Sequence, residues 1–196
     1  MESPSIRVAQ SARLKVVTEI VPPSPPLAGE RIVLRPFRVG DARAVADACR
    51  DPDIPRFTMM AEGLTEEQAA DWIERGLEWW ARGVARFAVV IPPEDRCVGQ
   101  IGLQLDTLAR RAEAFYWIDR PVRGQGFAAE ALELVTQWAF RDFHILRVQL
   151  VTHLDNKASQ RVADRCGFKR EGVLRAWEPV KDHQPDVVMF SRLVDD

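Results

Sequence analysis

The stretch RPVRGQGFAAEALELVTQWAF, Arg120 to Phe140, runs from a basic turn with two glycines directly into a helical apolar pattern. Gly124 and Gly126 let the backbone turn tightly and approach a ligand closely. A helix that begins at such a turn presents unpaired N–H groups and the positive end of its dipole, a combination that binds anions. Because Arg123 adds a cation that can fork onto phosphate oxygens, the stretch predicts a pyrophosphate site. The helical stripe that follows consists of Phe127, Ala131, Leu134, Val135 and Trp138.

Length and composition predict one globular domain. The chain has 196 residues, of which 46% are hydrophobic and 29% are charged, enough for one substantial core. No apolar run approaches the roughly 18 residues that cross a bilayer. Charged residues interrupt the N-terminal apolar stretch LKVVTEIV, so no signal peptide is expected. The predicted location is cytoplasmic, with no membrane partner.

The distribution of charge is more informative than the net charge of -2, which argues against a broad nucleic-acid-binding face. From Arg110 to Arg170 there are 11 Lys and Arg against 7 Asp and Glu, and the rest of the chain has 16 against 22. The segment around the glycine turn therefore carries +4, and the remainder carries -6. This polarity suits a small polyanionic ligand better than a nucleic acid.

Cysteine and histidine give no sign of a disulfide framework or a metal site. Cys49, Cys97 and Cys166 are scattered, which favours buried, reduced thiols. No metal is predicted, because no metal-ligand spacing links the histidines, which are His144, His153 and His183.

The first 29 residues are predicted to form an arm outside the domain, which is expected over residues 30–196. VPPSPPLAGE is a proline-rich linker that excludes a helix or a central strand, and LKVVTEIV alternates weakly enough for a short strand. A domain-swapped or dimer-bridging arm, giving a homodimer, is a hypothesis at this level.

The pattern after the linker alternates between strands and helices. RIVLRPF alternates as a strand, and Asp41 is the expected N-cap of a helix that stops before Pro52. A second helix starts at Thr65, where TEEQ forms a capping box with Gln68, and Gly83 closes it. RFAVVI, CVGQIGLQL and RAEAFYWI follow at hairpin spacing and predict an antiparallel meander.

The segment after the glycine turn completes a mixed sheet. RVQLVTH predicts a strand that is parallel to the strand before the turn and crosses over right-handedly. A helix is expected from Lys157 to Arg165, ending at Gly167, and DVVMFSRL is the last strand. The predicted fold class is α/β (mixed α+β), with a central mixed sheet flanked by helices.

The residues leave three interpretations of the glycine turn open. It can be a structural connection without a ligand. It can bind a dinucleotide, because Gly124, Gly126 and Ala129 satisfy G-x-G-x-x-A. That pattern expects an acidic residue about 20 positions on, at the end of the next strand, and this position falls near His144, outside any predicted strand. The third interpretation rests on a resemblance.

RGQGFA is similar to the R/Q-x-x-G-x-G/A signature of GNAT-superfamily N-acetyltransferases, with Arg123, Gly126 and Ala128 at the defining positions. DNKASQRVADRCGFKREGVLR resembles the second signature of the RimJ/RimL-like branch. ERIVLRPFRVGDA and AEAFYWI resemble its opening and central strands, so the likeness covers residues 30–193. The resemblance implies the GNAT fold, a mostly antiparallel sheet splayed at the acyl-CoA site.

The resemblance also implies a co-substrate and residues that bind it. Acetyl-CoA or another acyl-CoA would be the donor, with the pantetheine arm paired with Ile118 and hydrogen-bonded by Asn156. Lys157 and Arg161 are within reach of the adenosine phosphates, with a solvated role as the alternative. Backbone N–H groups would hold the pyrophosphate, and these belong to Gly124, Gln125, Gly126, Phe127 and Ala128.

Two residues are candidates for catalysis. Many GNAT enzymes protonate the leaving thiolate with a tyrosine, and the matching position here is Ala163, whereas the only tyrosine, Tyr116, is in the central strand. By resemblance to the RimL branch, Ser159 would protonate the thiolate instead, the alternative being an ordinary helix serine. Glu113 is the candidate general base, directly or through water, or else an exposed strand glutamate.

The acceptor would bind between RFTMMAEGLT and the loop RAWEPVKDHQPD. Protein N-termini, polyamines and aminoglycosides all fit a site with acidic and apolar walls. The predicted activity is N-acyl transfer from acyl-CoA to a primary amine, and the alternative is a catalytically silent acyl-CoA sensor or scaffold. The acidic candidates are Glu62, Glu178, Asp182 and Asp186, and the apolar ones are Phe57, Met59 and Trp177.

Overall fold

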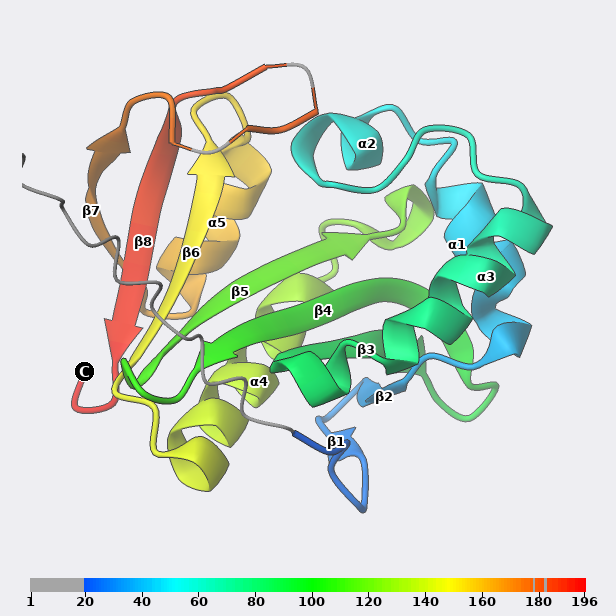
Figure 1. Cartoon of the computed structure of the whole chain (residues 1–196), viewed down its shortest axis with the longest axis horizontal. Coiled ribbons are helices and arrows are strands. Elements are labelled where there is room, and N and C mark those ends of the chain that lie inside the picture. The colour runs from blue at the N-terminus through cyan, green and yellow to red at the C-terminus, as the bar shows by residue number, and fades with distance from the viewer. Residues whose placement is uncertain (1–19, 178, 182) are drawn as a thin grey trace, which may run out of the picture.

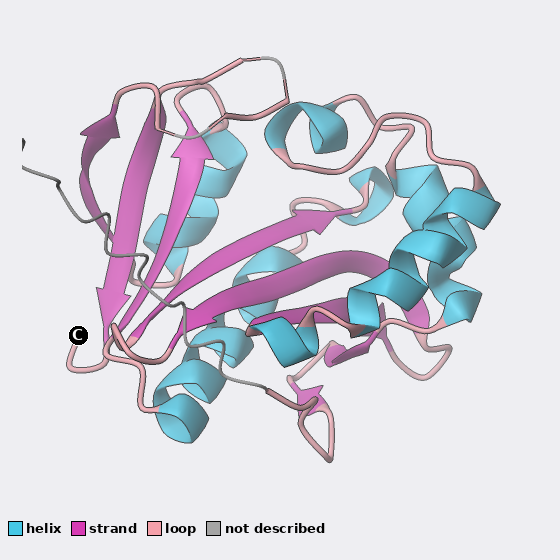
Figure 2. Ribbon diagram, in the orientation of Figure 1, coloured by secondary structure: helices cyan, strands magenta, loops and turns pink. Residues whose placement is uncertain are grey.

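The computed structural model describes residues 20–177, 179–181 and 183–196. Their centre is one eight-stranded sheet in the order β1-β2-β3-β4-β5-β6-β8-β7. Every neighbouring pair is antiparallel except β5 and β6. Helices cover both faces, with α1 and α3 on one side and α4 and α5 on the other (Figure 1; Figure 2). The predicted mixed, mostly antiparallel sheet flanked by helices is confirmed.

The elements follow the chain in a simple order. The strands are β1 Leu27–Ala28, β2 Val33–Pro36, β3 Val84–Ile91, β4 Arg96–Asp106, β5 Arg111–Ile118, β6 Arg147–His153, β7 Lys169–Leu174 and β8 Val187–Leu193. The α-helices are α1 Ala42–Ala48, α2 Asp53–Phe57, α3 Glu66–Leu77, α4 Phe127–Phe143 and α5 Lys157–Arg165, and the short 3-10 helices are η1 Val39–Asp41, η2 Trp80–Arg82 and η3 Arg120–Val122.

One predicted helix end and the role of one predicted N-cap need correction. Asp41 is the N-cap residue of α1, as predicted. Its carboxylate, however, accepts no bond from that helix; it pairs with the buried Arg35 at 2.7 Å and accepts the Arg38 N–H at 2.8 Å. A buried cation outcompetes a helix N–H for a carboxylate because it carries a full charge. Gly83, at a φ of 77°, closes η2 rather than α3. The capping box is confirmed, since Thr65 and Gln68 bond each other's backbone N–H groups.

Three short elements were not predicted. α2 has five residues, too few to show a helical period. β7 is mostly exposed and carries a register shift between Arg170 and Gly172, so its sequence KREGVL does not alternate. β1 pairs two linker residues with β2 and thereby forms one edge of the sheet. Each is held by tertiary contacts that leave no local pattern in the sequence.

The parallel pair β5 and β6 is the feature that shapes the site. Only Arg111–Glu113 of β5 pairs with Arg147–Gln149 of β6, and beyond these three pairs the strands diverge. Figure 1 shows the resulting V-shaped gap between the two strands. α4 connects them across one face, as the predicted strand, helix, strand unit requires.

The two faces of the sheet carry separate hydrophobic clusters. The larger cluster packs α4 against the face that bears Ala114, Tyr116 and Ile118 of β5. The smaller cluster packs α1 and α3 against the opposite face, which bears Trp117. Because side chains alternate along a strand, Glu113 and Phe115 lie on the same face as Trp117. The β5 strand thus sends one set of side chains into each layer.

The predicted arm lies largely outside the described residues. Residues 1–19 carry most of LKVVTEIV, so its predicted strand and its dimer-bridging role remain predictions. Within the described part, Ile20 is buried and its N–H donates to the Trp80 carbonyl at 3.2 Å. The boundary at residue 30 also remains a prediction. Over the described ranges, no helix combines the length and apolar character needed to cross a membrane.

Candidate active site

The glycine turn has the conformation that an anion site requires. Gly124 and Gly126 have φ values of 78° and 89°, in the left-handed region that favours glycine. Gly126 is the N-cap of α4, and no side chain caps the helix there. The first N–H groups of α4 are therefore left for a ligand. The Gln125 carbonyl is turned away, because it accepts from Arg31 Nη1 at 2.7 Å.

The arginines around the turn have different partners from those expected. The Arg123 guanidinium lies 2.5 Å from Asp51 and 3.2 Å from Asp53, and its Nε donates to the Ile118 carbonyl at 2.9 Å. With two carboxylates beside it, this side chain ties the turn to α2, and it also lines the cavity. Its contact with a phosphate remains a prediction.

Two other arginines flank the turn. A Cβ placed on Gly126 would lie 3.2 Å from Arg31 Nη2 and 3.5 Å from Arg165 Nη1. Arg31 pairs with Glu130 at 3.0 Å, and it stacks over Phe127, with 5.1 Å from its Cζ to the ring centroid. Arg165, at the end of α5, lines the cavity beside the turn. No local pattern points to Arg31, which lies 93 positions before Gly124.

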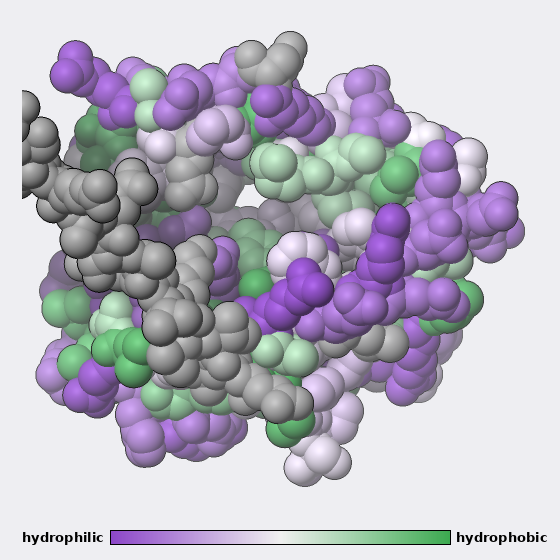
Figure 3. Space-filling view, viewed as in Figure 1, coloured by the Kyte–Doolittle hydropathy of each residue, from purple (hydrophilic) through white to green (hydrophobic). Residues whose placement is uncertain are grey.

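A cavity of about 970 Å³ runs through the gap between β5 and β6. It is lined on one side by Gly124, Gly126 and Ala128 of the turn and on the other by Phe57, Met59 and Trp177. The space-filling view shows a hollow at its mouth beside α2 (Figure 3). One continuous cavity therefore joins the predicted donor and acceptor sides.

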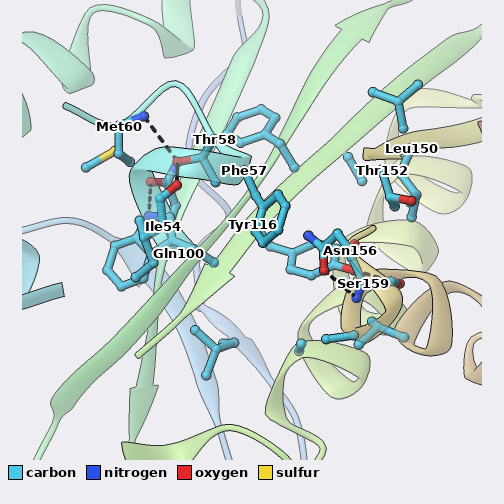
Figure 4. A pocket seen from close by; sticks show the side chains of 18 of the residues that line it. Ile54, Phe57, Thr58, Met60, Gln100, Tyr116, Leu150, Thr152, Asn156 and Ser159 are labelled. Carbon is cyan, nitrogen blue, oxygen red and sulfur yellow. Dashed lines mark hydrogen bonds between the residues drawn. The ribbon is translucent and has the colours of Figure 1, made fainter. Parts of the chain in front are cut away.

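α5 places a serine against the only tyrosine. Asn156 is the N-cap of α5, and its Oδ1 accepts the Ser159 N–H at 3.0 Å. Ser159 Oγ lies 2.7 Å from Tyr116 Oη, which also donates to the Ser159 carbonyl at 3.3 Å. Figure 4 shows Tyr116 pointing from β5 toward Ser159 and Asn156. Burial raises the pKa of Tyr116 well above its ordinary value, so the phenol stays protonated at neutral pH.

Tyr116 is the cavity residue that the sequence analysis did not connect with Ser159. Ala163, at the position where many GNAT enzymes have a tyrosine, is buried in α5. A buried tyrosine hydroxyl normally finds a hydrogen-bond partner. Because Tyr116 lies on the face of β5 that α4 and α5 cover, this rule predicts a partner on one of those helices, and Ser159 of α5 is that partner.

Glu113 reaches the same cavity from the other face of the sheet. It lines the cavity, and its Oε2 accepts from Gln149 Nε2 at 2.9 Å. Glu113 and Tyr116 are three positions apart on β5, so their side chains leave opposite faces. The structure thus places Ser159 on the α4 and α5 side of the gap and Glu113 on the α1 and α3 side.

The acceptor side is more apolar than predicted. Glu62 and Asp186 do not line the cavity, and Asp186 Oδ1 instead accepts the Ala176 N–H at 2.9 Å. Glu178 and Asp182 lie outside the described residues. Phe57, Met59 and Trp177 do line it, as predicted. His153 also lines it, and burial lowers the pKa of this imidazole.

The thiols lie away from this chemistry. Burial raises the pKa of Cys49 and Cys166 to about 11 and that of Cys97 to about 12, so all three stay as thiols at neutral pH. They are free and buried, as predicted. Over the ranges that the structure describes, no group of three or more His, Cys, Asp and Glu side chains is arranged to hold a metal ion.

Comparison with known proteins agrees with this geometry. A family model described as "Acetyltransferase (GNAT) domain" matches residues 31–169. The chain is 29% identical over 166 residues to the uncharacterized N-acetyltransferase p20 of Bacillus licheniformis, covering 84% of this chain and 93% of the relative. It is 29% identical over 132 residues to the ribosomal-protein-serine acetyltransferase of Escherichia coli, covering 67% of this chain and 73% of that one.

The fold is also shared with solved structures. RimL, a ribosomal alpha-N-protein acetyltransferase, in complex with coenzyme A, has a TM-score of 0.75 at 20% identity. The match covers 87% of this chain and 97% of that one.

Proposed function

The chain belongs to the GNAT acetyltransferase family, and from that premise we propose how its cavity transfers an acyl group. It is an acyl-CoA-dependent N-acetyltransferase of the RimJ/RimL-like branch that acts on a primary amine. The observation that carries the proposal is the Tyr116–Ser159 pair, set at 2.7 Å on the wall of a cavity that opens to both faces of the sheet.

The donor binds on the α4 and α5 side. Its pyrophosphate accepts hydrogen bonds from backbone N–H groups of the turn, from Gly124 through Ala128, with Arg165 as the neighbouring cation. The pantetheine arm lies in the gap beside Ile118, and the Asn156 amide lines its path. This pose brings the thioester to the part of β5 that has lost its strand partner.

Acyl transfer then breaks the carbon–sulfur bond. The amine nitrogen attacks the thioester carbonyl, the tetrahedral intermediate collapses, and coenzyme A leaves as a thiolate while the new amide forms. The thiolate takes the proton of Ser159 Oγ–H, and the serine oxygen is reprotonated from water, which is balanced by release of the amine proton to solvent. The single Tyr116 hydrogen is within reach of the Ser159 carbonyl at 3.3 Å and of Ser159 Oγ at 2.7 Å. During transfer it points to Oγ, so that the serine keeps its own hydrogen for the thiolate, and Tyr116 acts as a positioning residue.

Glu113 takes the proton that the amine loses, directly or through water. How much a general base accelerates the reaction depends on the pKa of the acceptor amine. An α-amine with a pKa near 7.8 is roughly 15% neutral at pH 7, whereas a lysine near 10.4 is only about 0.04% neutral. A protein N-terminal α-amine or another amine of low pKa therefore needs little help, and a lysine needs a strong base.

The test is steady-state acetylation of two peptides, one with a free N-terminus and one with a blocked N-terminus and a lysine. We expect the free N-terminus to be the better acceptor. Glu113→Gln should then lower kcat/KM more for the lysine peptide than for the α-amine peptide. Equal and negligible losses for both would refute the role of Glu113.

A silent acyl-CoA-binding sensor is the second candidate, and the names of the relatives do not favour it. Release of free thiol in the presence of an amine separates the two, because a binder releases none. Titration with acetyl-CoA and succinyl-CoA in parallel identifies the donor. A cytoplasmic location and a homodimer remain predictions.

A further inference from the structure

Among the residues that the structure describes, the acceptor side of the cavity contains a guanidinium that forms no ion pair. Arg86, on β3, lines the cavity. Its Nε is buried and has no hydrogen-bond partner within residues 20–177, 179–181 and 183–196. Within the same ranges, no carboxylate lies within ion-pair distance of its guanidinium. Other buried or half-buried arginines of this protein, such as Arg35 and Arg123, pair with aspartates.

Aromatic rings hold this guanidinium in place. Its Cζ lies 5.1 Å from the Trp79 ring centroid, 5.4 Å from Trp72 and 5.8 Å from Phe115. Gly102, the β4 partner of both Arg86 and Phe115, makes room for the ring, because a Cβ there would lie 2.3 Å from Phe115 Cζ. Cation–π contacts position a guanidinium but do not replace a carboxylate.

The position of Arg86 relates it to the reacting amine. β3, β4 and β5 are adjacent strands, and Arg86, Gly102 and Phe115 form one row across them. Glu113 is two positions from Phe115 on the same face of β5. Arg86 therefore lies on the same face of the sheet as Glu113, two strands across from it, and both side chains line the cavity.

Resting on the proposed acetyl transfer, we infer that Arg86 binds a carboxylate of the acceptor. The acceptor is then an amine that carries a carboxylate a few bonds away, such as a peptide N-terminus with an acidic residue close behind it. Polycations such as polyamines and aminoglycosides are disfavoured, because they would bring positive charge to an unpaired guanidinium.

The energetics support a role in binding. Partial burial lowers the pKa of Arg86, because a partly desolvated charge is destabilised until a counter-charge approaches it. Such a group persists where a ligand supplies the missing charge. A carboxylate arriving at this guanidinium forms charge-assisted hydrogen bonds in a half-desolvated site, which is where such bonds discriminate most.

The experiment compares matched acceptors. One is a tripeptide amide with aspartate at its second position, and the other has asparagine there. A free dipeptide, whose only carboxylate is its own C-terminus, represents a small-molecule source. We expect kcat/KM to be about tenfold higher for the aspartate peptide than for the asparagine peptide, the equivalent of one charge-assisted pair. A higher value still for the dipeptide would assign the carboxylate to a small molecule.

Variants locate the effect. Arg86→Met should abolish the discrimination between the two peptides, and Arg86→Lys should restore part of it. Thermal unfolding provides the second readout: loss of an unpaired buried charge should leave the melting temperature of Arg86→Met equal or higher. A guanidinium that only fastens α3 to the sheet would instead lower the melting temperature and leave the ratio of kcat/KM values near one in the wild type.

Binding separates this inference from the proposed function. Calorimetry of both peptides with the protein and free coenzyme A needs no turnover. Tighter binding of the aspartate peptide without acetylation would support Arg86 and overturn the proposed transfer. Acetylation of both peptides at equal rates and with equal affinity would overturn the role of Arg86 alone.

Discussion

The donor and acceptor sides of the cavity are built in different ways. The donor side is made of backbone: two glycines with positive φ, the uncapped start of α4 and the divergence of β5 from β6. The acceptor side is made of side chains from elements far apart in sequence, including α2, α3, β3 and the loop after β7. We therefore expect the affinity for the acyl-CoA donor to depend on a few glycines and the choice of acceptor to depend on individual side chains.

Substitution of Ser159 gives the largest expected effect. Ser159 is a side chain on the donor side, so it tests whether donor affinity depends on the backbone alone. Ser159→Ala should lower kcat by about 10²-fold, since it removes the proton donor to the thiolate. The affinity for acetyl-CoA should stay nearly intact, because the backbone holds the pyrophosphate. Steady-state kinetics and calorimetry on the same protein check both values. A matching loss of affinity would break the division, and an unchanged kcat would remove Ser159 from catalysis.

The glycines test it from the other direction. Gly126→Ala should weaken acetyl-CoA binding on the order of 30-fold, because a side chain at a φ of 89° is strained and its Cβ crowds Arg31 Nη2, at 3.2 Å. Gly124→Ala is the matched control: its φ is 78°, but a Cβ there meets nothing within 4 Å. The difference between the two affinities, measured by calorimetry, isolates the crowding from the strain.

Equal losses for both glycine variants would mean that strain alone sets donor affinity. No loss for either would mean that the backbone of the turn does not hold the pyrophosphate, and the donor side would then need a different assignment.

Tyr116 sharpens the boundary between the two sides. Tyr116→Phe should lower kcat by about tenfold, because the Ser159 hydroxyl loses the partner that orients it. The effect should nearly vanish when Ser159 is already alanine, which a double-mutant cycle measures. A tyrosine that only packs the core would give the same loss in both backgrounds. Urea unfolding of each variant controls for stability.

The sequence predicted the parts that depend on neighbouring residues better than the parts that depend on contacts between distant ones. The meander, the parallel crossover and the bounds of α5 were predicted correctly, because capping boxes, alternation and glycines act on neighbouring residues. α2 and β7 were missed, since Pro55 and the shift at Arg170 hide any period. Asp41 was expected to cap a helix and instead pairs with Arg35, a contact that only the folded sheet creates.

The same holds for the site. The glycine turn has the positive φ values that its glycines indicate, while the arginines around it have partners that no local pattern indicates. Arg123 pairs with Asp51, some 70 positions earlier, and Arg31 arrives from the linker side of β2. No local pattern encodes such contacts, so the acceptor side, which consists of them, was the part least accessible to prediction.

The smallest expected effect concerns the strand that forms the far wall of the gap. At the start of β6, Arg147 forms two hydrogen bonds with Glu171 of β7, at 2.6 and 2.7 Å, and Ser191 of β8 adds a third at 2.7 Å. Arg147, followed by Ser191, holds the pKa of Glu171 at about 2, below its ordinary 4.5. The Glu171 side chain is 44% exposed, so solvent screening limits the contribution to about 1 kcal/mol. Glu171→Gln should therefore lower the melting temperature by a few degrees at pH 7.

The pH dependence of that effect has a definite sign. Between the two pKa values the unfolded chain binds more protons than the folded one, so the contribution of Glu171 is complete above pH 4.5 and is lost as the pH falls toward 2. Melting curves of wild type and Glu171→Gln should converge over that window. Asp142→Asn, which removes the exposed ion pair with Arg141, is the control. Its melting temperature should equal that of the wild type at both ends of the pH window. A difference that persisted at low pH would show that Glu171 supports β6 through packing, and the wall of the gap would then be held by shape rather than charge.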